Sequence, residues 1–321
     1  MTTKKINSKA FICILIFLSI QLWSQTSLKH IQTFDTKPET ILTSPVFSND
    51  GKFVIAGGAN GSLNKFSPKS KLPIKQNKLD KGGINAVAIT PDGKYILAGG
   101  FLGTLYLCDP ETLEVLKSSD EFSSNINRIT IAPNSTIAYV QTNGKCELIN
   151  VADLSIIGDN GSYTKFNASF SDDSTLLYHL TSNRRISITD ATNAKSKKFI
   201  DLTREVQDII PSRDKNLIIA GVQEGYGEST IIHIIDVATG GIKKLVETSE
   251  YGDYAMPLCL VPEFDKVIYS CYDGLYTLDY KTFETKKIGS SDILSMRFSN
   301  DGKYVVTTAL RSKSISLLAI Q

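Results

Sequence analysis

Ser48-Asn49-Asp50-Gly51-Lys52 is the stretch that decides the fold, because nearly the same turn returns twice, as Thr90-Pro91-Asp92-Gly93-Lys94 and Ser299-Asn300-Asp301-Gly302-Lys303. Each copy lies between two short apolar segments; around the second copy these are Val87-Ala88-Ile89 and Tyr95-Ile96-Leu97-Ala98. An Asp-Gly pair between apolar runs predicts a β-hairpin, since glycine takes a positive φ without a Cβ clash. The three copies therefore predict three hairpins of one design.

Weaker copies of this turn fill the middle of the chain. They are Ala132-Pro133-Asn134-Ser135-Thr136, Ser171-Asp172-Asp173-Ser174-Thr175, Pro211-Ser212-Arg213-Asp214-Lys215 and Pro262-Glu263-Phe264-Asp265-Lys266. Markers at positions 51, 93, 135, 174, 214, 265 and 302 are 42, 42, 39, 40, 51 and 37 residues apart. A four-stranded propeller blade repeats every 40–45 residues or so, roughly the same period. The sequence therefore predicts an all-β chain of seven units.

A second feature recurs at a fixed distance after the hairpins. A third apolar strand ends in an acidic or amide residue that begins another turn, at Asp109, Asn150, Asp190, Asp236 and Asp279. The side chain of Asp or Asn accepts hydrogen bonds from backbone N–H groups two residues on, which forms an Asx-turn. We expect these residues to shape the turn into a fourth strand rather than to act as acids or metal ligands.

Together, the hairpin turn, the Gly-Gly turns at Gly57-Gly58 and Gly99-Gly100, and the strand that ends in Asp resemble the WD-repeat family. Asp109, Asp190, Asp236 and Asp279 match the aspartate of the Trp-Asp motif, while Cys108, Thr189, Ile235 and Leu278 stand where its tryptophan would be. The Gly-His dipeptide of the family is absent from every unit. The resemblance covers essentially the whole chain after the N-terminal segment. It implies a seven-bladed β-propeller of four-stranded antiparallel blades that binds other proteins.

The two ends of the propeller region predict how the ring closes. The chain stops at Gln321 after a third strand, Ile315 to Ile320, so the last unit lacks a fourth strand. The stretch from Leu28 to Phe34 precedes the first complete unit and belongs to none. We predict that it supplies the missing outer strand, pairs an otherwise open edge and buries Leu28, Ile31 and Phe34.

Residues 1–24 read as a secretory signal peptide. Lys4, Lys5 and Lys9 precede an apolar run from Ala10 to Leu22, as an export signal requires. The run is short of the roughly 20 apolar residues of a membrane span, so we expect cleavage and no membrane insertion. Residues 25–321 would then form the propeller, with 32 basic and 33 acidic residues. This balance argues against nucleic acid as a partner. From the signal peptide we expect an exported protein, periplasmic or extracellular, and we expect it to be a monomer.

No grouping of residues indicates catalysis, a metal or a cofactor. His30, His179 and His233 fall in predicted strands of different units, and no Cys-x-x-Cys or His-x-x-x-His spacing occurs. The sequence favours a protein- or peptide-binding scaffold without enzymatic activity. A lactonase-like propeller enzyme and a small-ligand or glycan-binding propeller are the alternatives. Several charged residues on the innermost strands would favour the enzyme, and those strands read mostly apolar or small.

The candidate docking surface is the face that carries the turns between second and third strands. The longest such loops belong to units five and six and include Tyr226, Tyr251 and Tyr254. Phe101, Arg184, Arg185 and Arg311 occupy the matching turns of other units. Tyr and Arg are enriched at binding hot spots, so we predict that these seven residues contact the partner.

The cysteines leave one alternative open. Cys259 and Cys271 flank one predicted hairpin and are either a cross-strand disulfide or two small core residues, depending on strand register. Cys108 and Cys146 lie near opposite ends of third strands, and we expect them to be unpaired.

Overall fold

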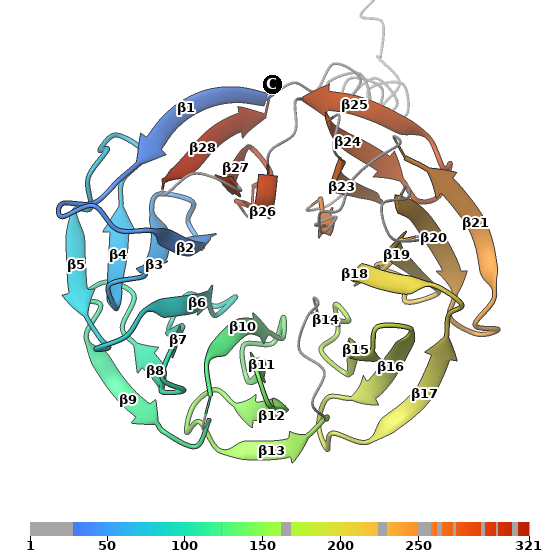
Figure 1. The fold of residues 1–321 in the computed structure, drawn as a ribbon, viewed down its shortest axis with the longest axis horizontal. Helices are drawn as coiled ribbons and strands as arrows, with labels where there is room; N and C mark the ends of the chain where they lie inside the picture. Colours follow the sequence, from blue (N-terminus) through green and yellow to red (C-terminus); the bar gives the residue numbers. More distant parts are fainter. Residues whose placement is uncertain are drawn as a thin grey trace, which may run out of the picture.

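The computed structural model describes residues 28–122, 124–161, 168–223, 230–248, 258–261, 265–271, 274–289, 293–299, 301–309 and 314–320. The strands form seven four-stranded antiparallel sheets, which are the blades of a β-propeller around a central channel (Figure 1). No described residue lies in a helix, so none of the described chain forms a helix that could cross a membrane. The predicted signal segment, residues 1–24, and the residues up to 27 lie outside the described part.

Each blade runs outward from the channel. Blades 1 to 4 consist of β2 (Leu42–Phe47), β3 (Val54–Gly58), β4 (Ser62–Phe66) and β5 (Lys75–Lys78); β6 (Ile84–Ile89), β7 (Ile96–Gly100), β8 (Leu105–Cys108) and β9 (Val115–Ser119); β10 (Ile126–Ile131), β11 (Ile137–Thr142), β12 (Cys146–Asn150) and β13 (Ile156–Asp159); β14 (Ser169–Phe170), β15 (Leu176–Ser182), β16 (Arg185–Asp190) and β17 (Ser196–Asp201).

Blades 5 to 7 follow the same plan. They consist of β18 (Glu205–Pro211), β19 (Leu217–Gln223), β20 (Thr230–Asp236) and β21 (Ile242–Glu247); β22 (Leu258–Leu260), β23 (Lys266–Cys271), β24 (Gly274–Asp279) and β25 (Thr285–Gly289); β26 (Ile293–Phe298), β27 (Tyr304–Ala309), β28 (Ile315–Ile320) and β1 (Leu28–Phe34).

The core lies between blades rather than inside one sheet. The second strands β3, β7 and β11 are buried along their whole length, because each blade has a neighbour on both faces. One core cluster joins Leu97 of blade 2 to Ala138 and Val140 of blade 3. The outer strand β5 carries mainly exposed polar side chains, since only solvent covers it.

The hairpin turns keep one geometry even where the residue changes. Gly51 has a φ of 68°, and Ser135 and Ser174 have φ values of 66° and 62° at the same position. The two serines have a further role, since their hydroxyls accept the N–H groups of Asp92 and Asn134 in the preceding blade, at 3.0 and 2.9 Å. The turns therefore link adjacent blades around the ring.

The fifth marker is displaced by one residue from the prediction. The N–H of Lys215 donates to the Ser212 carbonyl at 2.9 Å, as that of Gly51 donates to Ser48 at 2.8 Å. Lys215, with a φ of 61°, is therefore the equivalent of Gly51, and Asp214 is not.

The predicted Asx-turns are confirmed in five blades. One side-chain oxygen each of Asp109, Asn150, Asp190, Asp236 and Asp279 accepts a backbone N–H two or three residues on, at 2.7 to 3.0 Å. A backbone bond from the residue four positions later closes each turn, as from Leu113 to Asp109.

The predicted ring closure is confirmed. β1 pairs antiparallel with β28, from Leu28 opposite Ile320 to Phe34 opposite Ile315. Phe34 is fully buried, and its ring centroid lies 5.0 Å from that of Phe66 in blade 1. The expectation for Ile31 was wrong, because a bulge between His30 and Gln32 leaves this side chain 43% exposed.

The disulfide alternative is not realised. Cys259 lies opposite Ile268 and Cys271 lies opposite Gly274, so the two cysteines are not cross-strand partners. None of the four described cysteines forms a disulfide, as predicted for Cys108 and Cys146, and these two are buried.

Candidate functional site

One face of the ring carries both the turns between second and third strands and the links between blades. In blade 2 the N–H of Phe101, in such a turn, donates to the carbonyl of Gly83 in the preceding link, at 2.7 Å. In blade 4 the N–H of Leu202, in the following link, donates to the carbonyl of Arg184 at 2.8 Å. We call this the link face. The opposite face carries the turns between first and second strands, and we call it the hairpin face.

Phe101 and Leu102 form the tip of the turn between β7 and β8. They are 55% and 62% exposed, more than any other large apolar side chain in the described chain. Their backbone is held firmly, because the N–H of Gly100 donates to Thr104 at 2.8 Å. Gly103, with a φ of 93°, has no room for a Cβ, which would lie 1.7 Å from the Phe122 carbonyl oxygen. The turn therefore presents two apolar side chains from a rigid base.

A third exposed apolar side chain, Ile41, lies on the same face in the link that leads to β2. Its carbonyl accepts the N–H of Ala59 at 2.9 Å, and Ala59 lies against Gly83, whose carbonyl holds Phe101. Backbone contacts between blades 1 and 2 therefore hold the segments that carry Ile41, Phe101 and Leu102 next to each other.

The other predicted docking residues fall in different places. Arg184 is exposed on the link face, in the turn between β15 and β16. Arg185 is ion-paired instead, with its Nε 2.5 Å and its Nη2 3.0 Å from the carboxylate of Asp201 on the outer strand, and it covers the ring of Phe199. Phe101 and Arg184 belong to blades 2 and 4 and are not neighbours in the ring. The remaining four, Tyr226, Tyr251, Tyr254 and Arg311, lie outside the described residues.

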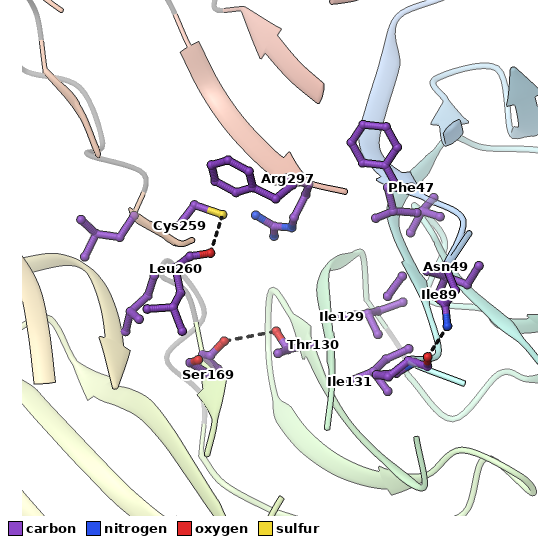
Figure 2. A pocket seen from close by; sticks show the side chains of 18 of the residues that line it. Phe47, Asn49, Ile89, Ile129, Thr130, Ile131, Ser169, Cys259, Leu260 and Arg297 are labelled. Atoms are coloured by element: carbon purple, nitrogen blue, oxygen red, sulfur yellow. Dashed lines mark hydrogen bonds between the residues drawn. The ribbon is translucent and has the colours of Figure 1, made fainter. Parts of the chain in front are cut away.

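The central channel contains a cavity of about 390 Å³. Its walls come from the first strands of all seven blades and from the flanking Ala168, and most of the residues in them have apolar side chains. Asn49 and Pro91 at its edge belong to first-to-second-strand turns, so the cavity extends to the hairpin face. Figure 2 shows Arg297 pointing into this space from β26, between Cys259 and Phe47.

Four charged residues stand on the innermost strands, where the sequence was read as mostly apolar or small. Glu205, the first residue of β18, accepts a hydrogen bond from the Asn183 side chain at 2.6 Å. Arg128, Asp208 and Arg297 belong to β10, β18 and β26, in blades 3, 5 and 7. The repeat held a signal for two of them, since Arg128 and Asp208 share one position when residues are counted back from the hairpin turn. Small or apolar residues fill that position in other blades, for instance Ala86.

The electrostatics of these groups depend on burial. Burial, together with the positive charge of Arg297, lowers the pKa of Arg128 to about 10, while Asp208 acts in the opposite direction. Asp208 itself accepts the backbone N–H groups of Ile209 and of Leu258 in blade 6, at 2.8 and 2.9 Å. Burial also raises the pKa of the Cys259 thiol to about 11, which keeps it protonated near neutral pH and disfavours a nucleophilic thiolate.

His179 and His30 make structural contacts within the propeller. His179 is buried, and its ring nitrogens lie 3.3 Å from the Tyr139 hydroxyl and 2.9 Å from that of Thr189. His30 is exposed on β1 and bonds to Thr33 at 3.0 Å. Among the described residues, no group of three or more His, Cys, Asp or Glu is placed to hold a metal ion.

Residues 74–109 match the family model of the WD domain, G-beta repeat. The chain is a WD-repeat-like β-propeller. The matched span starts before β5 of blade 1 and ends after β8 of blade 2, so the sequence repeat is offset by one strand from the blade. The same offset appears at the ring closure, where β1 completes the blade of β26 to β28. Comparison with curated proteins found no match. WD-repeat propellers generally serve as scaffolds for protein interactions.

Proposed function

We propose that this propeller is an exported, non-catalytic monomer that binds a protein or peptide through its link face. The observation that carries the proposal is the exposed pair Phe101 and Leu102 on a backbone-anchored turn. A rigid aromatic anchor loses little conformational entropy on binding, and such anchors account for much of the affinity of protein interfaces. The N-terminal basic and apolar segment supports export to the periplasm or beyond.

Neighbouring residues define the surface that a partner would cover. Ile41 extends the apolar contact into blade 1, and Arg184 adds a cation in blade 4. The tyrosines predicted in the loops of units five and six would widen the surface across the channel mouth. We expect the partner to place an apolar side chain against Phe101 and Leu102.

Site-specific photo-cross-linking in the source cells tests this proposal. A benzophenone amino acid replaces Phe101 in one variant and Leu116 in another; Leu116 is 54% exposed but lies on the outer strand β9. We expect one defined protein to be captured from position 101 and not from position 116. Phe101→Ala should then weaken binding of that purified partner by about 2 kcal/mol, and Leu116→Ala should not.

Two results would contradict this placement. Equal capture from both positions would show that Phe101 is not at the interface. Unchanged affinity of Phe101→Ala, with losses for Tyr226→Ala, Tyr251→Ala or Tyr254→Ala, would move the interface to the loops of blades 5 and 6.

A further inference from the structure

The channel cavity is separate from the link-face surface and has the features of a small-molecule site. Its volume of about 390 Å³ lies within the range of roughly 300–1,000 Å³ for ligand pockets, which are typically apolar with a few placed polar groups. Its apolar walls include Phe47, Ile89, Ile131 and Phe298. Because it extends to the hairpin face, a ligand could enter without passing Phe101 or Leu102.

Arg297 of blade 7 lines this cavity, and a second arginine, Arg128 of blade 3, lies on an innermost strand next to the lining residue Ile129. Arg297 points inward (Figure 2), and only its Nη1 has a protein partner among the described residues, the Met296 carbonyl at 2.8 Å. Arg128 acts electrostatically on Arg297 of blade 7 and Asp208 of blade 5. Blades 3, 5 and 7 are not adjacent, and the space that all three border is the channel. The charges of these three blades therefore act on one another around the channel, although Arg128 does not itself line the cavity.

Arg128 is only partly buried, but one of its guanidinium nitrogens lacks a partner in the described part of the protein. Its Nη1 is buried and has no hydrogen-bond partner within the described chain. Neither Arg128 nor Arg297 forms an ion pair with a described carboxylate, although ion pairs are common on the surface of this protein. A buried N–H without an acceptor is costly, so the retention of this nitrogen points to an acceptor that comes from outside the chain.

The position of Arg128 along the channel indicates where a partner for its guanidinium would lie. Ile129, which follows Arg128 in β10, lines the cavity. Arg128 is one residue further from the hairpin turn and does not line the cavity, so it lies just beyond the inner end of the cavity. The apolar walls extend from there to the hairpin face.

We propose that the channel binds a small molecule with an apolar body and a single carboxylate, and that the carboxylate lies between Arg128 and Arg297. Planar guanidinium groups bind carboxylates through paired N–H donors. Two arginines and Asp208 leave one net positive charge among these three groups, which one carboxylate neutralises. A doubly charged phosphate would leave an excess negative charge in an apolar space.

Calorimetry on the full propeller with defined probes tests the site. Octanoate has the predicted chemistry, 1-octanol has the same body without the charge, and inorganic phosphate has the charge without the body. We expect octanoate to bind at least about tenfold more tightly than either of the others, the usual worth of a charge-assisted hydrogen bond. Arg128→Met and Arg297→Met should each abolish this preference, whereas Arg185→Met, on the outer strand, should retain it.

Thermal unfolding without any probe gives an independent readout. If Arg128 is kept for a ligand, Arg128→Met should unfold at the same temperature as the parent or higher, because a buried nitrogen without a partner has been removed. A lower unfolding temperature would assign Arg128 a structural role and overturn the proposal. So would equal binding of octanoate and octanol, an octanoate preference that survives in Arg297→Met, or tighter binding of phosphate than of octanoate.

Discussion

At the scale of single residues, His179 links stability to pH. It lies in β15, and burial lowers its pKa to about 4. A histidine of the unfolded chain takes up a proton near pH 6.5, so protonation favours unfolding between these values. The contribution of the neutral ring is complete above pH 6.5 and is lost as the pH falls toward 4.

We therefore expect the free energy of unfolding to fall by about 3 kcal/mol from this group between pH 7 and pH 4. Urea unfolding at pH 7, 5.5 and 4 measures the change. His179→Gln, which cannot take up a proton, should show a distinctly flatter dependence over this range. An identical pH dependence in the parent and the variant would exclude His179 as the responsible group.

Asp109 acts through its turn rather than through its charge. Its Oδ1 accepts the N–H groups of Glu111 and Thr112 at 2.9 and 2.7 Å, and these bonds lower its pKa. Asp109→Asn keeps an acceptor in the same place and should leave stability nearly unchanged. Asp109→Ala should cost about 1 kcal/mol, the usual contribution of a hydrogen bond. Equal losses in urea unfolding for both variants would instead show that the carboxylate charge matters.

At the scale of elements, turns were predictable from the sequence and strand registers were not. The Asp-Gly pairs located the hairpins because only a few residue types accept a positive φ. Cys259 and Cys271 show the limit. The disulfide alternative assumed a hairpin centred on position 265, whereas the strands pair Leu260 with Val267, which moves the centre of the pairing one to two residues earlier. An error of that size in a strand changes every cross-strand partner.

A bulge in the innermost strands explains why the channel residues were missed. The register shifts after Ile84, Ile126, Val206 and Ile293, at the same place in four blades. The residues at the shift are Asn85, Asn127, Gln207 and Leu294, which share no chemical property that would predict a bulge. Bulges redirect the side chains beside them. Arg128 and Asp208 are the next residues after the bulges in their strands, so their side-chain directions could not be read from strand alternation in the sequence.

At the scale of the whole molecule, the period of the repeat predicted the seven blades and their order. Seven units of similar length, each apolar on both faces of its second strand, can be covered only by one another. The link-face residues are harder to predict, since Phe101 and Arg184 sit on separate blades and a fold does not define a partner. Likewise, the channel arginines come from blades 3 and 7, far apart in sequence.

Ring closure depends on β1, which joins blade 7 to blade 1. Phe34 is the residue of β1 that is buried in the core between these two blades. Phe34 is fully buried among Phe66 and Leu42 of blade 1 and Ile315 and Leu317 of β28. Phe34→Ala should therefore cost about 3–5 kcal/mol, as expected for an aromatic removed from a core.

Ile31→Ala is the matched control, since this side chain lies on the same strand but is 43% exposed, and it should change stability by no more than about 0.5 kcal/mol. Urea unfolding of both variants measures the difference directly. If the strand closes the ring, Phe34→Ala should also expose both edges of the junction, and limited proteolysis should cut before β2 earlier than in the parent. Equal stability of the two variants would contradict this role. It would show that removing the buried Phe34 side chain does not affect the packing of blades 7 and 1, so that β1 covers an edge without holding the propeller closed.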